Sequence, residues 1–184
     1  HSPLDPVRTH PAPALLKSGT VKLPFKSVAV LTPSADKKPR QSQVRIIENN
    51  PERFSVEITS DSEWVDHFSW RLADWPDHDQ KISDDSGFWV RRVAGEVRRI
   101  IVMNEDSVTI DSNQETIELS FDGPFEGWFD RTDTGWIVTP DAYNAVTPKL
   151  LVFEITRDGQ VESFRTQSTE PLRPNTGHRL VLRA

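Results

Sequence analysis

The chain has 184 residues, a formal net charge of −6 and no cysteine, and its pI is about 5.4. An acidic chain gains nothing from releasing the counterions of phosphate groups, so this charge argues against nucleic acid as a general partner. The absence of cysteine excludes disulfides and thiolate metal sites, and no apolar run approaches the roughly 18 residues that span a bilayer. The length predicts one domain, or one domain with a tail.

Proline dominates the start of the chain. Four prolines lie within residues 1–18, and because proline removes a backbone donor and fixes φ, this segment is predicted to be an extended arm or linker. Residues 19–184 are predicted to form a single domain. Asn49, Asn50 and Pro51 indicate a turn between two of its early strands. These early strands are expected at residues 21–23, 26–31, 43–48 and 53–59.

A tryptophan-rich stretch follows at residues 64–72. Its even-numbered residues are Trp64, Asp66, Phe68, Trp70 and Leu72, and they alternate with Val65, His67, Ser69 and Arg71. This period of two indicates a strand with one buried face, and on this parity Trp70 is expected to be buried. After an acidic loop, two strands at residues 88–93 and 96–103 are predicted to form a hairpin around Ala94 and Gly95.

Turn signals recur regularly in the second half of the chain. Strands are expected at residues 107–111, 114–121, 126–131, 136–139, 149–156, 160–166 and 178–183. Short strands at intervals of about 8–12 residues are typical of a sandwich or barrel. We therefore predict an all-β fold, an antiparallel β-sandwich with about a dozen strands and no substantial helix. Residues 141–146 are the best candidate for a short helix.

The acidic loop and its surroundings offer oxygen and imidazole ligands for a metal ion. The residues considered are His67, Asp77, His78 and Asp79, because carboxylates bind calcium and histidine together with carboxylates binds zinc. Their spacing is not that of an EF-hand, and no histidine pair has helical ligand spacing. A calcium or zinc ion stays open at this stage, and a solvated loop without a cofactor is the simpler interpretation.

No known catalytic pattern accounts for the polar residues. The chain has no G-x-S-x-G nucleophile elbow, no phosphate-binding glycine loop and no cysteine nucleophile. Tyr143, the only tyrosine, is a candidate base for lyase chemistry, but a packed loop tyrosine is the simpler interpretation. The sequence therefore identifies no catalytic residue.

Six tryptophans suggest a carbohydrate ligand, because a flat indole stacks on the apolar face of a sugar ring. Trp89 shares its parity with Arg91 and is expected on the wetter face of its strand. Trp136 follows a turn glycine, where exposed aromatic residues can lie. Arginine could also bind a uronate or a sulfate, so Trp89, Arg91 and Trp136 are the predicted ligand-binding residues, with core packing as the alternative for each tryptophan.

Two stretches resemble parts of a known family. Residues 87–104, followed by residues 107–111, resemble the hairpin in the closing β-domain of heparinase II/III-like polysaccharide lyases, and residues 64–72 are similar to the strand ahead of that hairpin. This resemblance implies that the chain is the C-terminal β-domain of such a lyase or a detached relative of it. In that family the catalytic tyrosine, histidine and asparagine belong to an α/α toroid, so none of them is carried over to a position in this sequence.

The sequence therefore leads to one hypothesis and two alternatives. The hypothesis is an extracellular or periplasmic, non-catalytic domain that binds an acidic polysaccharide or supports the catalytic domain of a polysaccharide lyase. A self-contained carbohydrate-active enzyme would instead need convergent ionisable groups in a concave site. A structural protein-interaction domain would expose an apolar patch.

Overall fold

The computed structural model describes residues 42–60, 64–71, 86–141, 148–166 and 171–182. The chain divides into two units, His1–Pro33 and Ser34–Ala184, and all of the described residues belong to the second. They form ten strands, and every pairing between these strands is antiparallel. The all-β, antiparallel part of the predicted fold is therefore confirmed. Within these ranges there is no helix that could cross a membrane.

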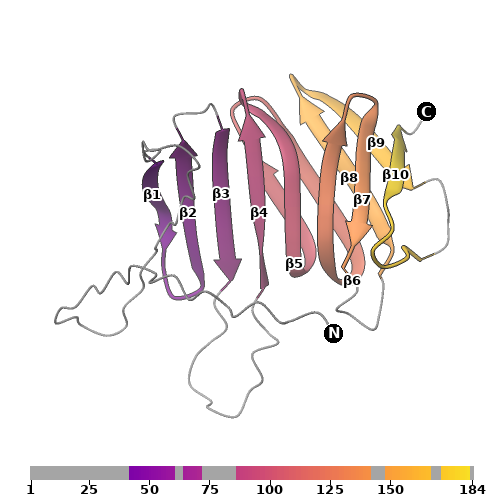
Figure 1. Cartoon of the computed structure of the whole chain (residues 1–184), viewed down its shortest axis with the longest axis horizontal. Coiled ribbons are helices and arrows are strands. Elements are labelled where there is room, and N and C mark those ends of the chain that lie inside the picture. Colours follow the sequence, from indigo (N-terminus) through magenta and orange to yellow (C-terminus); the bar gives the residue numbers. More distant parts are fainter. Residues whose placement is uncertain (1–41, 61–63, 72–85, 142–147, 167–170, 183–184) are drawn as a thin grey trace, which may run out of the picture. The chain divides into compact units, whose positions relative to one another are not determined.

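The first part of the sheet is a meander of four strands: β1 (Ser42–Asn49), β2 (Arg53–Ser60), β3 (Trp64–Arg71) and β4 (Ser86–Val93). Each strand pairs with the next one along the chain (Figure 1). The turn between β1 and β2 depends on Asn50, whose Oδ1 accepts hydrogen bonds from the N–H groups of Glu52 and Arg53 at 3.0 and 2.6 Å. An asparagine side chain that binds the backbone in this way favours a turn, as the sequence indicated.

The hairpin predicted around Ala94 and Gly95 is confirmed. It joins β4 to β5 (Glu96–Asp111), and φ is +52° at Ala94 and +84° at Gly95. Positive φ at both central residues is the geometry of a type I′ turn, whose twist matches that of the flanking strands. Glycine adopts this conformation easily, whereas a side chain at Ala94 makes it strained.

Two long strands replace the four short ones predicted for residues 96–131. β5 contains 16 residues and β6 (Thr116–Thr132) contains 17. The turn signals that begin at Asn104 and Asp122 lie inside these strands: φ is +53° at Asn104, and the β5–β6 register shifts on both sides of Glu105. Such bulges bend a strand and increase its twist. These polar residues therefore mark irregularities within a strand, and the prediction of chain reversals here was wrong.

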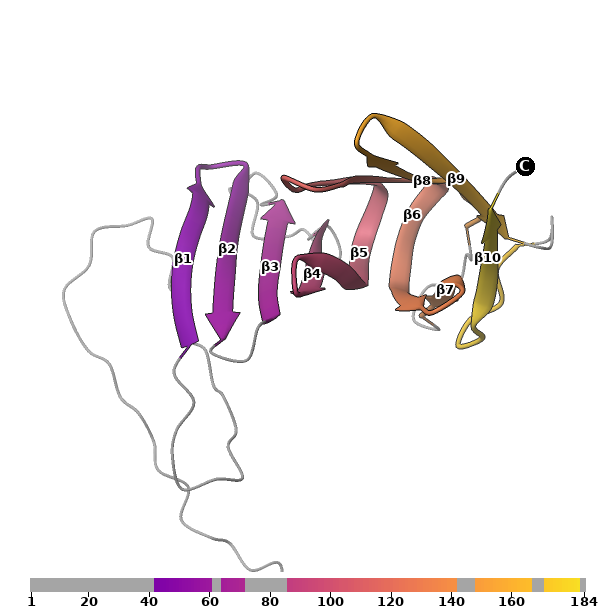
Figure 2. The ribbon, with the colours of Figure 1, turned by 90° about the horizontal axis from the view of Figure 1, so that it is seen from above.

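The remaining strands are β7 (Gly135–Pro140), β8 (Leu150–Arg157), β9 (Gln160–Thr166) and β10 (His178–Leu182). The first part of β6, residues 116–121, pairs with β8, and its last part, residues 127–132, pairs with β7. Because β10 joins β7 to β9 and β9 pairs with β8, these five strands close a barrel. Strands β1 to β5 continue the sheet from β6 as additional strands, as Figure 2 shows from above.

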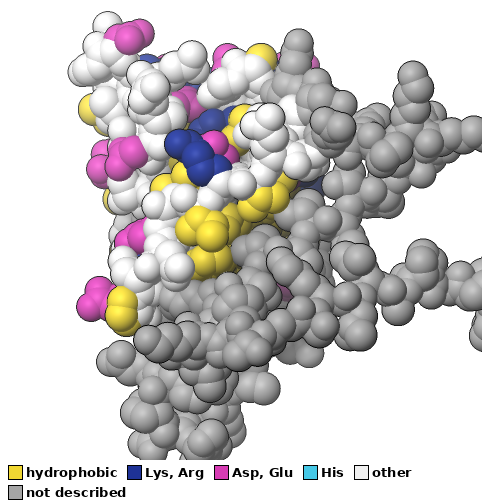
Figure 3. Space-filling view, turned by 90° about the vertical axis from the view of Figure 1, so that its left-hand side faces the viewer, with side chains coloured by type: hydrophobic (Ala, Val, Ile, Leu, Met, Phe, Trp, Pro, Cys, Tyr) yellow, Lys and Arg dark blue, Asp and Glu magenta, His cyan; other side chains and the backbone are white. Residues whose placement is uncertain are grey.

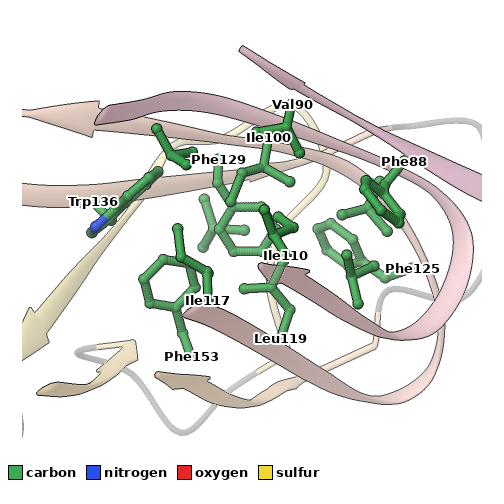
Figure 4. Packing of buried hydrophobic residues seen from close by; sticks show 14 of the residues in the cluster. Phe88, Val90, Ile100, Ile110, Ile117, Leu119, Phe125, Phe129, Trp136 and Phe153 are labelled. Atoms are coloured by element: carbon green, nitrogen blue, oxygen red, sulfur yellow. The ribbon is translucent and has the colours of Figure 1, made fainter. Parts of the chain in front are cut away.

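The hydrophobic core fills the barrel and extends beneath β4 and β5. Its side chains come from both halves of β5 and β6, and Figure 4 shows Ile100 and Ile110 of β5 with Ile117 and Phe129 of β6 in one cluster. Aromatic rings pack against one another within it: Phe121 and Phe125 stack with their centroids 4.3 Å apart. Because one long strand contributes to the core from both sides of its bend, the bends of β5 and β6 are what make this core possible.

Trp136 belongs to this core. Its side chain is only 2% exposed, and its ring centroid lies 5.1 Å from that of Phe153. Trp136, Val138 and Pro140 are the buried residues of β7, so the alternation of the strand directs this tryptophan inward. The expectation of an exposed ring after a turn glycine was therefore wrong.

Several predictions concern residues that the structure does not describe. They are the arm at residues 1–18 with its boundary to residues 19–184, the strands at residues 21–23 and 26–31, the acidic loop, and Tyr143. The short helix expected at residues 141–146 also lies outside the described residues, except for Asp141, which has no helical structure. These predictions stay open.

Candidate functional site

One face of the sheet formed by β2, β3 and β4 collects aromatic side chains. Residues that lie opposite each other in an antiparallel pair point to the same face. The register places Phe54 opposite Trp70, and Phe68 opposite Trp89. It also places Asp66 opposite Arg91. We call this set the aromatic face: Phe54, Trp64, Asp66, Phe68, Trp70, Trp89 and Arg91.

The rings of the aromatic face contact one another in series. Phe54 stacks on Trp70 with centroids 6.4 Å apart, and Phe68 lies 5.3 Å from Trp70 and 6.0 Å from Trp89. Offset and tilted contacts at such distances stabilise aromatic pairs beyond simple burial. The rings therefore hold one another in place and form a single continuous surface across three strands.

On β3 and β4 this surface is turned away from the core cluster, whereas its member on β2, Phe54, is buried at 8% exposure. On β4, Phe88 and Val90 are 8% and 0% exposed and belong to the core cluster, whereas Trp89 and Arg91 between and beside them are partly exposed. Trp64, Phe68 and Trp70 of β3 are also partly exposed. Trp89 and Arg91 thus lie on the wetter face of their strand, as their parity indicated.

The aromatic face is part of a longer row of opposite partners, which we call the cross-strand row. It crosses six strands, so with neighbouring strands about 4.8 Å apart it is about 24 Å long. Five of its six members are partly or well exposed, while Val56 is 1% exposed. The members of the row are Ile46, Val56, Phe68, Trp89, Ile101 and Trp128.

Trp70 lies on the same face as Trp89, and the prediction that placed it in the core was wrong. Trp70 is partly exposed and lies opposite Gly87, two residues from Trp89. Alternation correctly separates the two faces within each strand. It does not say which face of β3 continues into which face of β4, because that depends on the register between the two strands, which residues 72–85 separate in the sequence. Sequence reasoning therefore missed Trp64, Phe68 and Trp70 as neighbours of Trp89.

Arg91 is fixed by a buried carboxylate and by two indole rings. Its Nε and Nη2 donate hydrogen bonds to Oδ1 and Oδ2 of Asp66, both at 2.8 Å, and Asp66 is 5% exposed. The hydrogen bond to Asp66 raises the pKa of Arg91, so the guanidinium stays protonated. The guanidinium carbon lies 4.8 Å from the ring centroid of Trp64 and 5.0 Å from that of Trp89, within the range of cation–π contacts.

The indole N–H of Trp89 has no hydrogen-bond acceptor among the residues that the structure describes. This nitrogen is buried. Buried polar groups are normally hydrogen-bonded, and leaving one unpaired costs about 1–3 kcal/mol. A ligand or water that reaches this nitrogen would remove that cost.

His67, the metal candidate within the described ranges, lies on the opposite face of β3. Its imidazole stacks on Phe88 with centroids 5.9 Å apart, and burial, followed by the charge of Arg92, lowers its pKa. The other candidates, Asp77, His78 and Asp79, lie outside the described residues. Within those ranges no group of three His, Cys, Asp or Glu side chains is placed to hold a metal ion.

A buried carboxylate that the sequence did not indicate lies at one end of the barrel. Glu115 is 5% exposed; its Oε1 accepts a hydrogen bond from the N–H of Val97 at 3.1 Å, and its Oε2 accepts two from Arg157 at 2.8 and 2.6 Å. Arg131 lies 4.0 Å away. The charge of Glu115 is therefore compensated by protein groups, and its contacts connect β5, β6 and β8. A glutamate in a polar turn carries no sequence signal of such burial.

Comparison of the chain with protein-family models, with curated proteins and with solved structures gave no match. The resemblance to the closing β-domain of heparinase II/III-like lyases thus stays a prediction from the sequence. The aromatic face is therefore the structural basis for a functional proposal.

Proposed function

We propose that the aromatic face binds a polysaccharide, and that the chain acts as a non-catalytic binding domain. The observation that carries this proposal is the set of partly exposed rings held at stacking distances around Arg91 on one face of the sheet. An indole presents a flat apolar surface to the C–H groups of a sugar ring, and polar groups beside it satisfy the hydroxyls. Arg91, which lies beside the rings of Trp64 and Trp89, is such a group.

An acidic polysaccharide is the proposed class of ligand, with Arg91 as its contact. The pair with Asp66 uses Nε and Nη2, so Nη1 is the donor that would reach a carboxylate or a sulfate. Asp66 offsets the charge of Arg91, and the neighbouring Arg99 is offset by Asp130 in the same way. The electrostatic gain from an acidic sugar is therefore small, and we expect only a weak dependence of affinity on salt.

The proposed scaffold is a β-sandwich in its packing, because both halves of β5 and β6 contribute side chains to one core. The resemblance adds the proposal that this domain accompanies the catalytic domain of a lyase outside the cell or in the periplasm. A catalytic role for the described residues has less support. Among the described groups with shifted pKa values, His67 and Arg92 lie on one face of the sheet and Arg91 lies on the other, so they do not converge on one site with the aromatic face.

Binding titrations with the full chain test the proposal. Heparin and alginate serve as acidic probes and an uncharged glucan as the neutral probe. We expect Trp89→Ala to weaken binding to an acidic probe by about three- to tenfold, because it removes one stacking partner worth about 0.5–1.5 kcal/mol. Trp64→Ala should have a similar effect. The matched control is Leu182→Ala, which truncates an apolar residue of β10 that is 58% exposed.

The outcomes separate binding from folding. Thermal melts of each variant show whether the fold is retained. If Trp89→Ala and Trp64→Ala fold normally and bind as well as Leu182→Ala, the aromatic face is not the binding surface. If none of the probes binds to the unmodified chain, the proposal of a polysaccharide ligand fails. Release of unsaturated uronate, followed by ultraviolet absorbance, would show instead that the chain is itself a lyase.

A further inference from the structure

β1 is the terminal strand of the sheet that the described residues form. It pairs with β2 and with no other described strand, whereas β8, at the other end of the strand order, pairs with β6 and closes the barrel. A terminal strand presents a row of unpaired backbone N–H and C=O groups, which are a template for pairing with another chain. Charged side chains, proline or short length normally protect such an edge.

The edge formed by β1 is apolar and exposed. Three of its eight residues are large aliphatic side chains in contact with solvent. Val44, Ile46 and Ile47 are 46%, 56% and 44% exposed. Figure 3, which views the molecule from the β1 side, shows hydrophobic side chains gathered beside basic and acidic ones. Adding a strand here would bury apolar surface as well as satisfy backbone groups.

β1 itself carries one basic and one acidic residue, Arg45 and Glu48, so its own charges sum to zero. Nη2 of Arg45 lies 3.0 Å from Oε1 of Glu57 on β2, and Glu48 accepts a hydrogen bond from Nδ2 of Asn50 at 2.6 Å. Although the whole chain carries a net charge of −6, this edge is therefore locally close to neutral. Two copies of the chain can approach each other along it without placing uncompensated like charges together.

We propose that β1 pairs antiparallel with β1 of a second copy of this chain, with the two-fold axis at Val44. The regular part of β1 is residues 42–46, because the register with β2 shifts between Ile46 and Glu48. An axis at Val44 places Arg45 opposite Gln43 of the second copy. An axis at Arg45 would place two guanidinium groups opposite each other, which is unfavourable.

This pairing ends at a dimer. Each copy contributes the same strand to a two-fold interface, so the edge is consumed once both strands are paired. The paired stretch is short, and an interface of this size is at the weak, transient end of known interfaces. We therefore expect association that depends on concentration and has a micromolar dissociation constant.

Sedimentation equilibrium of the full chain over a range of concentrations tests the proposal. A monomer–dimer equilibrium is expected. Val44→Lys should abolish the dimer, because it places two ammonium groups opposite each other at the axis. The matched control is Val161→Lys on β9, where the valine is 59% exposed, and it should leave the equilibrium unchanged. Circular dichroism melts verify that both variants fold.

A second variant tests the register. Gln43→Glu would place a carboxylate opposite Arg45 of the second copy, twice by symmetry, and should tighten the dimer by about two- to tenfold. An unchanged or weaker dimer in this variant would overturn the axis at Val44. A chain that stays monomeric at all concentrations, a dimer that survives Val44→Lys, or growth beyond a dimer would each overturn the proposal. None of these outcomes depends on polysaccharide binding.

Discussion

At the scale of single residues, His67 makes stability depend on pH. Its pKa is lowered by burial and by the charge of Arg92, so the folded chain keeps the imidazole neutral where the unfolded chain already binds a proton. A group of this kind destabilises the fold as pH falls below its unfolded pKa of about 6.5, until its folded pKa is reached. The free energy of unfolding should therefore decrease from about pH 7.5 to about pH 5.0.

The variant His67→Gln isolates this contribution. Urea unfolding of both proteins at the two pH values should show a smaller loss of stability in the variant, with a difference of at most about 1.4 kcal/mol per pH unit. The carboxylates titrate in both proteins and cancel in the comparison. Equal losses in the two proteins would show that the environment of His67 does not oppose protonation.

Single residues also show how far strand parity extends. Parity predicted correctly that the side chains of Trp89 and Arg91 point to one face of β4 and those of Phe88 and Val90 to the other, because this difference arises within one strand. Parity did not predict the face of Trp70, because that face depends on the register between β3 and β4, and the two strands are far apart in the sequence. It failed also for Trp136, because a position beside a turn does not by itself determine burial.

At the scale of elements, Gly127 allows β6 to pass close to β7. Its φ is +154°, and a Cβ built there would lie 2.8 Å from Cα of Pro140 and would also meet the backbone oxygen of Thr139. Because the obstacle is backbone, Gly127→Ala should destabilise the protein by about 2–4 kcal/mol. Gly123→Ala, on the same strand with nothing within 4 Å of its Cβ, is the matched control. Urea midpoints that shift equally in both variants would contradict this reading.

The same strand explains why element boundaries were harder to predict than element type. Asn and Asp with glycine favour turns because they tolerate positive φ and bind their own backbone. A bulge within a long strand needs the same properties. The sequences at Asn104 and Asp122 therefore look alike for a reversal and for a bend. Only the pairing of β5 with β6, and of β6 with β8 and β7, distinguishes the two.

At the scale of the whole molecule, Glu115 helps to hold the barrel closed. Its partners lie 18 and 42 residues away along the chain, so no local pattern could have indicated it. Glu115→Gln leaves Arg157 with a neutral and therefore weaker hydrogen-bond partner. Because that arginine is partly exposed, we expect the free energy of unfolding, measured with a chemical denaturant, to decrease by about 2–3 kcal/mol. Glu118→Gln, at an exposed position of β6, should change stability by less than about 0.5 kcal/mol. A loss at Glu115 as small as this would contradict the role.

The terminal position of β1 has a consequence for how the fold opens. Strands of the barrel have neighbours on both sides, whereas β1, β2 and β3 can separate one after another from the end of the sheet without breaking the ring. Local opening is easiest where few contacts must be lost, so the backbone amides of β1 should exchange with solvent sooner than those of β6. The amides of β2, β3 and β4, which carry the aromatic face, should exchange at intermediate rates. A partner that covers β1 or stacks on Trp89 would slow this fraying. Hydrogen exchange would then detect binding as slower exchange of amides that the partner does not contact.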